Sequence, residues 1–428
     1  MRVPKQLLEI AGQRCRLINL PQHDSIIHLA MALPVGGDGG GDIRAAGFLP
    51  PAARMESGRT PSGRGLSKEQ AETRALGEAA QLISSCVWGN EDVVTSKFTD
   101  LDGQALHPNA LMMIGEEQYQ NRDSWNAENG DHDWIPLPFD IDKEADWVQV
   151  EELNGQSAIW VPAACVYIGW QNRGEANAFS VADSNGTAAG ETLESATVAA
   201  FLELVERDAT AIWWHGQHRR PMLEMAGLDL PDPFRDWLAK RGRLYQVLDL
   251  THDLDIPVFA AVSSDDSGGS IAIGISANFD PAAALVDALT EMCQMEFTVT
   301  MAKQQPDVAA GTPIGRWLET VTLSNMACLQ PSSQSNRYDT SKSDEKNLSD
   351  KQGIERITAI CTDHDLKAYR VDLTRPQVGV PVARVIVPGL CHFKKRDAAD
   401  RLVDVPQKLG WDLKLNGTAT LNPIPLLI

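Results

Sequence analysis

The sequence predicts a mixed α/β (α+β) fold in which three similar helices pack on β-sheets. Strand-like apolar runs alternate with helical segments along the chain, which is the pattern of α/β and α+β proteins. Three of the helical segments repeat one layout, in which a glycine-bearing turn leads to a helix-capping residue. Hydrophobic residues make up 43% of the 428 residues and charged residues 22%, as in a globular protein with a sizeable core.

The three helical segments carry polar side chains at matching positions. Their caps are Ser67, Thr192 and Asp280, and a Glu or Gln follows each cap by eleven and by fourteen positions. Side chains three positions apart lie on one face of a helix. The pairs are Glu78 with Gln81, Glu203 with Glu206, and Glu291 with Gln294. Because carboxylates in one site resist joint ionisation, this arrangement predicts a cage around metal ions.

Strand-like runs and turns connect these helices. The first thirty residues contain short apolar segments, including residues 25–33, and lead to a glycine-rich turn or lid at residues 36–41. Residues 1–55 are expected to be a strand-containing segment of the same body as the rest of the chain. Apolar and β-branched runs predict strands at 158–170, 179–181, 258–262, 270–275, 369–373 and 382–387. A further helix is predicted near 354–362.

Two polar stretches and the C-terminus are predicted to lie outside the core. Residues 91–145 are rich in Asn, Asp and Glu and are expected to be surface elaboration. Residues 331–353 lack the apolar content to pack, so they predict a flexible insertion. Pro423 and Pro425 predict an extended tail, because proline does not continue a helix.

Charge and composition argue against several classes of partner. The formal net charge is -20, from 58 acidic and 38 basic residues, which disfavours nonspecific binding of nucleic acid or anionic lipid. No apolar run approaches the length of a membrane helix, and there is no signal pattern, so a cytoplasmic location is expected. The seven cysteines include no C-x-x-C pair and predict neither structural zinc nor a disulfide framework.

The segment Glu203-Leu-Val-Glu206-Arg207 is the strongest local candidate for chemistry. Carboxylates at this spacing suit Mg²⁺, which binds one or two carboxylates together with nucleotide phosphates. Arg207 is placed to contact a phosphate. For the segment alone, a solvated helix face with an ordinary Glu–Arg pair is the alternative. The two companion helices at matching spacing favour the metal site.

The turns before the helices offer candidate anion sites. Residues 62–65 (SGRG) and Asn185-Gly186 each place flexible backbone beside a helix N-terminus. Each turn alone is also compatible with an ordinary turn, and no Walker loop occurs. His215 and His218 have a spacing that zinc ligands use, but no third ligand is evident, so packing or surface roles are expected for them.

At these residues the chain resembles the YcaO domain family, whose members use ATP to activate backbone amides of peptides. The resemblance rests on five strings, which are SGRG through Glu78, SNGTAAGETLESATVAAFLELVERDA from residue 184, DPAAALVDALTEMCQ from residue 280, VDLTR from residue 371 and VIVPGL from residue 385. It covers roughly residues 55–428 and is most specific in the second string. The resemblance implies a YcaO-type fold with the three helices around a nucleotide pocket, and an ATP-binding catalytic domain over residues 56–428.

The resemblance also implies roles for single residues. Glu78, Glu203 and Glu206 are implied as Mg²⁺ ligands and catalytic residues. Nucleotide contacts are implied for Ser62, Arg64, Arg74, Asn185, Arg207, Glu291 and Gln294. In the implied reaction a Cys, Ser or Thr side chain attacks the preceding amide carbonyl. The amide oxygen takes the γ-phosphoryl group of ATP, and phosphate leaves to give an azoline.

Several positions depart from the family pattern. Gln81 stands where a second glutamate is usual, Arg74 stands where a serine is common, and Asp287 stands where an arginine is usual. Arg64 replaces a frequent lysine. One arginine is lost and another is gained, so the exchange would be compensatory if positions 74 and 287 meet. The tail also keeps only two prolines of a Pro-x-Pro-x-Pro ending.

The leading hypothesis is a cyclodehydratase subunit that forms thiazoline or oxazoline rings in a ribosomally made precursor peptide, in bacteriocin-like natural-product biosynthesis. The resemblance implies a separate leader-binding partner similar to ubiquitin-activating enzymes, a homodimer within a larger complex and, if the rings are oxidised to azoles, a flavin-dependent dehydrogenase. Two alternatives stay open. One is a YcaO enzyme that forms a thioamide or an amidine, and the other is a non-catalytic scaffold of the same fold.

Overall fold

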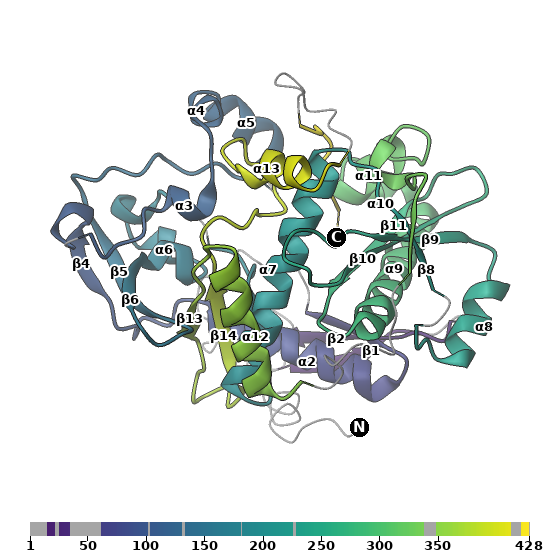
Figure 1. The fold of residues 1–428 in the computed structure, drawn as a ribbon, viewed down its shortest axis with the longest axis horizontal. Coiled ribbons are helices and arrows are strands. Elements are labelled where there is room, and N and C mark those ends of the chain that lie inside the picture. The colour runs from purple at the N-terminus through teal and green to yellow at the C-terminus, as the bar shows by residue number, and fades with distance from the viewer. Residues whose placement is uncertain are drawn as a thin grey trace.

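The computed structural model describes residues 15–21, 25–34, 61–101, 103–130, 133–180, 182–225, 228–337, 348–411 and 421–427. In this part of the chain three β-sheets are joined by three long helices (Figure 1). The structure therefore confirms the mixed α/β (α+β) class. The glycine-rich turn predicted at residues 36–41 lies outside the described residues.

The three sheets are mainly antiparallel. The first has the order β1-β2-β3, with bounds Cys15–Asn19, His28–Pro34 and Ser62–Gly65. The second has the order β11-β10-β9-β8-β12, with bounds Ala272–Ala277, Val258–Ser264, Leu244–Asp249, Met222–Glu224 and Ser335–Arg337. The third has the order β4-β5-β13-β14-β7 with β6 beside β5, and its bounds are Val94–Lys97, Glu144–Glu152, Tyr369–Asp372, Val382–Ile386, Thr187–Ala189 and, for β6, Ala158–Pro162.

The three long helices begin at the predicted caps. They are α2, α7 and α9, with bounds Lys68–Ser85, Leu193–His215 and Pro281–Gln304. The side chains of Ser67, Thr192 and Asp280 each accept a hydrogen bond from a backbone N–H of the first turn, which otherwise has no partner. The sequence Ser67-x-x-Gln70 could form a capping box at α2, but only half of it is formed, because Gln70 Oε1 accepts from the N–H of Leu66 instead of Ser67.

Shorter helices surround these elements. Beside α7 lie α12 and α13, with bounds Asp350–Asp363 and Arg401–Lys408. The others are α3, α4, α5, α6, α8, α10 and α11, with bounds Asn109–Met112, Glu116–Gln120, Arg122–Asn129, Ala163–Val166, Asp232–Lys240, Pro306–Ala309 and Pro313–Thr320. Within the described ranges no helix has the length and apolar character that crossing a bilayer requires.

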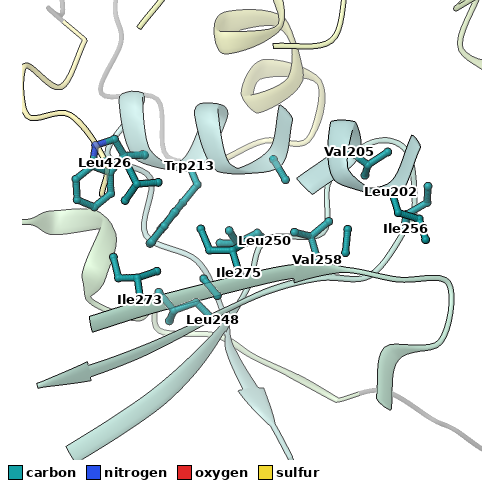
Figure 2. Close-up of a cluster of buried hydrophobic side chains, with 14 of the residues drawn as sticks. Leu202, Val205, Trp213, Leu248, Leu250, Ile256, Val258, Ile273, Ile275 and Leu426 are labelled. Carbon is teal, nitrogen blue, oxygen red and sulfur yellow. The ribbon is translucent and has the colours of Figure 1, made fainter. Parts of the chain in front are cut away.

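Helix α7 lies between the second and third sheets and fills a large core (Figure 1). Its side chains Val205 and Trp213 face Leu248, Val258 and Ile275 of the second sheet (Figure 2). Full burial of an aliphatic side chain such as that of Val205 contributes roughly 1.5–3 kcal/mol to the free energy of folding. The polar residues of α7 are therefore held on a helix that packing fixes in place.

Two predicted features differ in the structure. The strand predicted at 158–170 ends at Pro162 and is followed by α6, because a short run that is buried on all sides has no periodicity to separate strand from helix. Phe179 and Ser180 form no strand, and Val181 lies outside the described residues.

The two polar stretches also contain regular structure. The predicted insertion at 331–353 includes β12 and the start of α12, while residues 338–347 lie outside the described residues. Residues 91–145 include β4, a 3-10 helix at Phe98–Asp100, and the helices α3, α4 and α5. The partly buried Phe98 and Phe139 pack against the core around Trp147. The few apolar side chains of residues 91–145 are enough to anchor this stretch to the third sheet.

Candidate active site

The site is built from three strand–turn–helix units with one spacing. In each unit one strand residue lies five positions before the helix cap and sixteen positions before a glutamate. These strand residues are Ser62 in β3, Thr187 in β7 and Ile275 in β11. In two units the glutamate bonds to its strand. Glu78 Oε2 accepts from the N–H of Ser62 at 2.6 Å, and Glu291 Oε2 accepts from the N–H of Ile275 at 2.8 Å. The structure therefore confirms the repeated layout and gives it a physical basis.

Glycines allow the first and third helices to lie directly on their strands. A Cβ atom added to Gly63 would lie 2.1 Å from the carbonyl oxygen of Ala71, and one added to Gly274 would lie 2.1 Å from the backbone nitrogen of Met292. No side chain fits such a gap, so glycine is required by close approach rather than by backbone angle. The short distance lets each glutamate reach the backbone of its own strand.

The first and third units also bond to each other. The Gln294 Nε2 atom donates to Ser62 Oγ at 3.0 Å, and Arg64 Nη1 donates to Gln294 Oε1 at 3.4 Å. Arg64 Nη2 lies 3.5 Å from Glu291 Oε2. Four of the residues that the resemblance implied as nucleotide contacts thus form one connected group.

The second unit holds buried charges that are only partly balanced. Arg207 lies 3.4 Å from an oxygen of Glu203 and 3.4 Å from an oxygen of Glu206, so two carboxyls share one guanidinium. Burial raises the pKa of Glu203. Burial also raises the pKa of Glu206 to about 8, and repulsion from Glu291 and Glu203 adds to this rise against the attraction of Arg207. A cation at this place would favour the ionised carboxylates.

Among the described residues, the site has both hydrogen-bond donors and an acceptor that lack a partner. In the part of the chain that the structure describes, Nε of Arg64, Nε of Arg207 and Oδ1 of Asn185 are buried and have no hydrogen-bond partner. Buried polar groups without partners are costly, so they indicate a ligand with both acceptors and donors. This donor set fits a nucleotide and its metal ion.

A metal ion would depend on that ligand. Within the described ranges no three His, Cys, Asp or Glu side chains lie close enough together to hold a metal by themselves. The six-group cage expected from the helices is therefore not assembled by the protein alone. Magnesium commonly takes one or two carboxylates and completes its shell with phosphate oxygens and water, which suits Glu203 and Glu206.

The two unusual charges meet at the edge of the site. Arg74 Nη2 lies 2.5 Å from Asp287 Oδ1, and these residues stand four positions before Glu78 and Glu291 on α2 and α9. The exchange of an arginine between positions 287 and 74 is thus compensated by an ion pair. Arg74 points to Asp287 here, and its predicted contact with a nucleotide stays a prediction.

Other predicted residues lie outside this group. The backbone N–H of Asn185 donates to Asp183 Oδ1 at 3.0 Å. His215 Nε2 lies 2.8 Å from the carbonyl oxygen of Phe393, and the ring of His218 packs edge-on against Trp411, which supports packing roles for both histidines. Gln81 is half-buried on α2.

Charged residues that the sequence did not single out surround a cavity of about 150 Å³ beside Asn185. They include Asp183, Arg384 and Lys394. Asp183 belongs to the same turn as Asn185, so that turn was the available signal. Arg384 and Lys394 come from a segment about 200 residues later, and nothing in their local sequence indicates this meeting.

Comparisons with known proteins identify the family and the fold. A family model described as YcaO cyclodehydratase, ATP- and Mg²⁺-binding, matches residues 62–391. A solved heterocyclase in complex with substrate and cofactor has a TM-score of 0.85 and 29% identity, covering 100% of this chain and 58% of that one. The heterocyclase TruD has a TM-score of 0.70 and 30% identity, covering 85% of this chain and 52% of that one. The chain thus spans a little over half the length of these two structures.

More distant matches extend the comparison. YcaO from Methanopyrus kandleri, bound with AMPPCP and Mg²⁺, has a TM-score of 0.60 and 19% identity over 90% of each chain, which shows the shared fold. An uncharacterized protein of Methanothermobacter thermautotrophicus is 26% identical over 402 residues, covering 91% of this chain and 94% of that protein. An uncharacterized protein in the tfuA 3′ region of Rhizobium leguminosarum bv. trifolii is 27% identical over 57% of this chain and 60% of that protein.

Proposed function

The chain belongs to the YcaO family, and from this premise we propose that it is an ATP-dependent cyclodehydratase that converts Cys, Ser or Thr residues of a ribosomally made peptide to azolines. The observation that supports this proposal most is the unfinished charge balance of the second unit. Glu203 and Glu206 share one arginine, Arg207. Among the described residues, Arg207 and Arg64 of the first unit, which acts electrostatically on Glu206, each have a buried Nε atom without a hydrogen-bond partner. A site with these features gains free energy from a ligand that brings both cations and phosphate oxygens.

Each residue of the site has a proposed role. Glu78, Glu203 and Glu206 would hold Mg²⁺ together with phosphate oxygens of the nucleotide, and the ion would neutralise phosphate charge. The nucleotide would contact Arg207 and Asn185 of the second unit, and the residues Ser62, Arg64, Arg74, Glu291 and Gln294 of the other two. The guanidinium groups of Arg64 and Arg207 are suited to orient phosphate oxygens, because their N–H groups form a fixed planar fork.

The proposed reaction transfers the amide oxygen to phosphate. The thiol or hydroxyl of the peptide adds to the preceding carbonyl carbon and loses its proton. The carbonyl oxygen takes the γ-phosphoryl group of ATP and releases ADP. Loss of the amide N–H proton and of phosphate then leaves the C=N bond of the azoline. The protein contributes mainly positioning and fixed charge, as is usual in phosphoryl transfer.

The partners belong to the same proposal. A precursor peptide is the substrate, a separate leader-binding protein presents it, and a homodimer forms the core of the complex. A flavin-dependent dehydrogenase would follow only where azolines are oxidised to azoles.

Mass spectrometry of the peptide tests this function. Wild-type protein, a candidate precursor peptide with its leader-binding partner, and Mg-ATP should give loss of one water per ring together with one phosphate released. The variant Glu206→Gln should give neither, while Glu194→Gln, at an exposed position of the same helix, should behave as wild type. Phosphate release with an exchange of oxygen for sulfur would assign a thioamide instead. If the protein does not bind Mg-ATP, the non-catalytic scaffold remains as its function.

A further inference from the structure

The cavity beside α7 shares a wall with the nucleotide site. Its lining includes Asn185 from the turn before α7, and Leu204, which follows Glu203 on the helix. Two further lining residues, Asp183 and Arg384, act electrostatically on the carboxyl of Glu203. The cavity has a volume of about 150 Å³, enough for an apolar side chain. A group bound here lies next to the place proposed for the phosphates.

One side of the cavity is cationic. The ammonium group of Lys394 lies 3.3 Å from Asp183 Oδ2, and an ammonium has three donors, so this contact does not exhaust it. Arg384 donates to the backbone carbonyls of Cys165 and Asp183, which satisfy N–H groups without cancelling the charge. Among the lining residues Lys394, Arg384 and Arg396 are basic, whereas Asp183 is acidic.

Asp183 and its histidine partner fix this arrangement and do not transfer protons. Asp183 Oδ2 lies 2.9 Å from His392 Nε2, while Asp183 Oδ1 accepts from the N–H of Asn185. The Nδ1 atom of His392 accepts from the backbone N–H of Lys394 at 3.0 Å. Both ring nitrogens are therefore engaged. Despite burial, His392 and Lys394 hold the pKa of Asp183 well below its usual range, so this carboxylate stays a fixed anion.

Much of the remaining lining of the cavity is apolar. It is formed by Leu111, Ile114 and Trp134 from the segment that precedes β5, and by Val385 and Leu390 from the end of β14 and the turn that follows. This wall suits an uncharged side chain. The occupant that fits both sides is a peptide residue with an apolar side chain and a carbonyl oxygen that becomes negative during reaction.

We propose that this cavity holds the peptide residue that precedes the reacting Cys, Ser or Thr, with its side chain on the apolar wall and its carbonyl oxygen facing Lys394. The inference rests on the proposed function and adds a substrate site to it. When the nucleophile adds to the carbonyl carbon and its proton passes to water, the electron pair of the C=O bond moves to the oxygen. The Lys394 ammonium stabilises that negative charge before the oxygen takes the phosphoryl group.

Photo-crosslinking locates the peptide without depending on turnover. The probe is acetyl-photoleucine-Cys-Gly-amide, whose diazirine lies in the side chain that the apolar wall should hold, used at about 1 mM with protein, Mg²⁺ and AMPPCP because a short peptide without its leader binds weakly. We expect labels on residues 111–114, 133–136 and 384–391. Excess acetyl-Leu-Cys-Gly-amide should suppress them.

Variants connect this labelling to the charge. The substitution Lys394→Met should reduce labelling about tenfold, as expected for loss of a charge-assisted hydrogen bond, while Lys394→Arg should largely retain it. Lys395→Met is the matched control, because Lys395 does not line the cavity and its ammonium lies over the ring of Trp125. Trp134→Ala, at a side chain that is 47% exposed, tests the apolar wall if Lys394→Met fails to fold.

The outcomes separate this inference from the proposed function. Absent or scattered labels, or full labelling of both Lys394→Met and Trp134→Ala, overturn the cavity as the peptide site. Titration of wild-type protein with Mg-AMPPCP is a separate measurement. If the nucleotide analogue does not bind while the cavity is labelled and Lys394→Met loses the label, the peptide site stands and the ATP-dependent function falls.

Discussion

Two sets of buried acids on one helix differ in how their charge is balanced. On α7, Glu203 and Glu206 share Arg207, whereas Asp208, two positions further on, has several partners of its own. Arg401 donates to both carboxylate oxygens of Asp208. His252 Nε2 lies 3.1 Å from Asp208 Oδ2, and the N–H of Cys391 donates to Asp208 Oδ1 at 2.7 Å.

The pKa values of the two sets shift in opposite directions, and not in the order of burial: the side chain of Asp208 is fully buried, whereas Glu203 and Glu206 are 24% and 15% exposed. Although burial opposes it, Arg401 and His252 lower the pKa of Asp208, whereas burial raises the pKa of Glu203 and Glu206 despite Arg207. Burial alone therefore does not identify a functional acid. The number of donors around it does, because an acid with full partners stabilises the fold, while an acid with too few is suited to a cation.

The largest expected effect is on stability at the balanced acid. Asp208→Asn removes the charge that Arg401 and His252 face and should lower the free energy of unfolding by about 3–5 kcal/mol. Urea denaturation measures this change. Asp404→Asn on the exposed face of α13 is the control and should change stability by less than about 0.5 kcal/mol. A loss below about 1 kcal/mol at Asp208 would show that its network is not structural.

The end of α7 adds a neutral buried group and a pH dependence. Burial lowers the pKa of His215 from 6.5 to about 4. Between these values the unfolded chain binds a proton that the folded chain does not, so stability present above pH 6.5 is lost as pH falls toward 4. This histidine should account for about 3 kcal/mol of that loss. Denaturation at several pH values should show a smaller slope for His215→Asn, and an unchanged slope would contradict the assignment.

At the unbalanced pair, binding should change more than stability. Glu206→Gln should weaken Mg-ATP binding about 100-fold, or about 2.8 kcal/mol. Because the amide removes an incompletely paired buried charge, stability should stay within about 1 kcal/mol of wild type or rise. Calorimetric titration measures the first effect and thermal unfolding the second, with Glu194→Gln as control. Strong destabilisation without loss of binding would place Glu206 in the same class as Asp208.

The smallest expected effect is at the exchanged charges on α2 and α9. The side chains of Arg74 and Asp287 are 42% and 28% exposed, so solvent weakens their attraction despite the distance of 2.5 Å. A double-mutant cycle with Arg74→Met and Asp287→Asn should give a coupling energy of about 0.2–1 kcal/mol. The swap Arg74→Asp with Asp287→Arg should restore most of it. A coupling energy near zero would remove the pair as a compensation.

Local signals in the sequence predicted the helices well. The caps Ser67, Thr192 and Asp280 are recognisable because one side chain satisfies the backbone of the following turn, and the positions of Glu78, Glu203 and Glu291 follow from the helical period. The strand at 158–170 was predicted too long for the opposite reason. A run buried on every side has no period that reveals its conformation.

Contacts between distant segments were beyond the sequence. The Arg74–Asp287 pair joins residues 213 positions apart, and Lys394 reaches Asp183 across 211 positions. No pattern within a helix or a turn reports which elements become neighbours, since that depends on how the three sheets pack. Burial and, to a smaller extent, repulsion from Glu291 of α9 raise the pKa of Glu206, so this shift could not be derived from the E-x-x-E-R string.

The hydrogen bond between Gln294 and Ser62 links residues 232 positions apart, and this separation determines when the site can form during synthesis. Closing so large a loop costs entropy, and a chain is synthesised from its N-terminus, so the first unit waits until α9 has left the ribosome. A site that needs both units can therefore form only late in synthesis. A chain stalled before residue 294 would hold two thirds of the protein and no complete site.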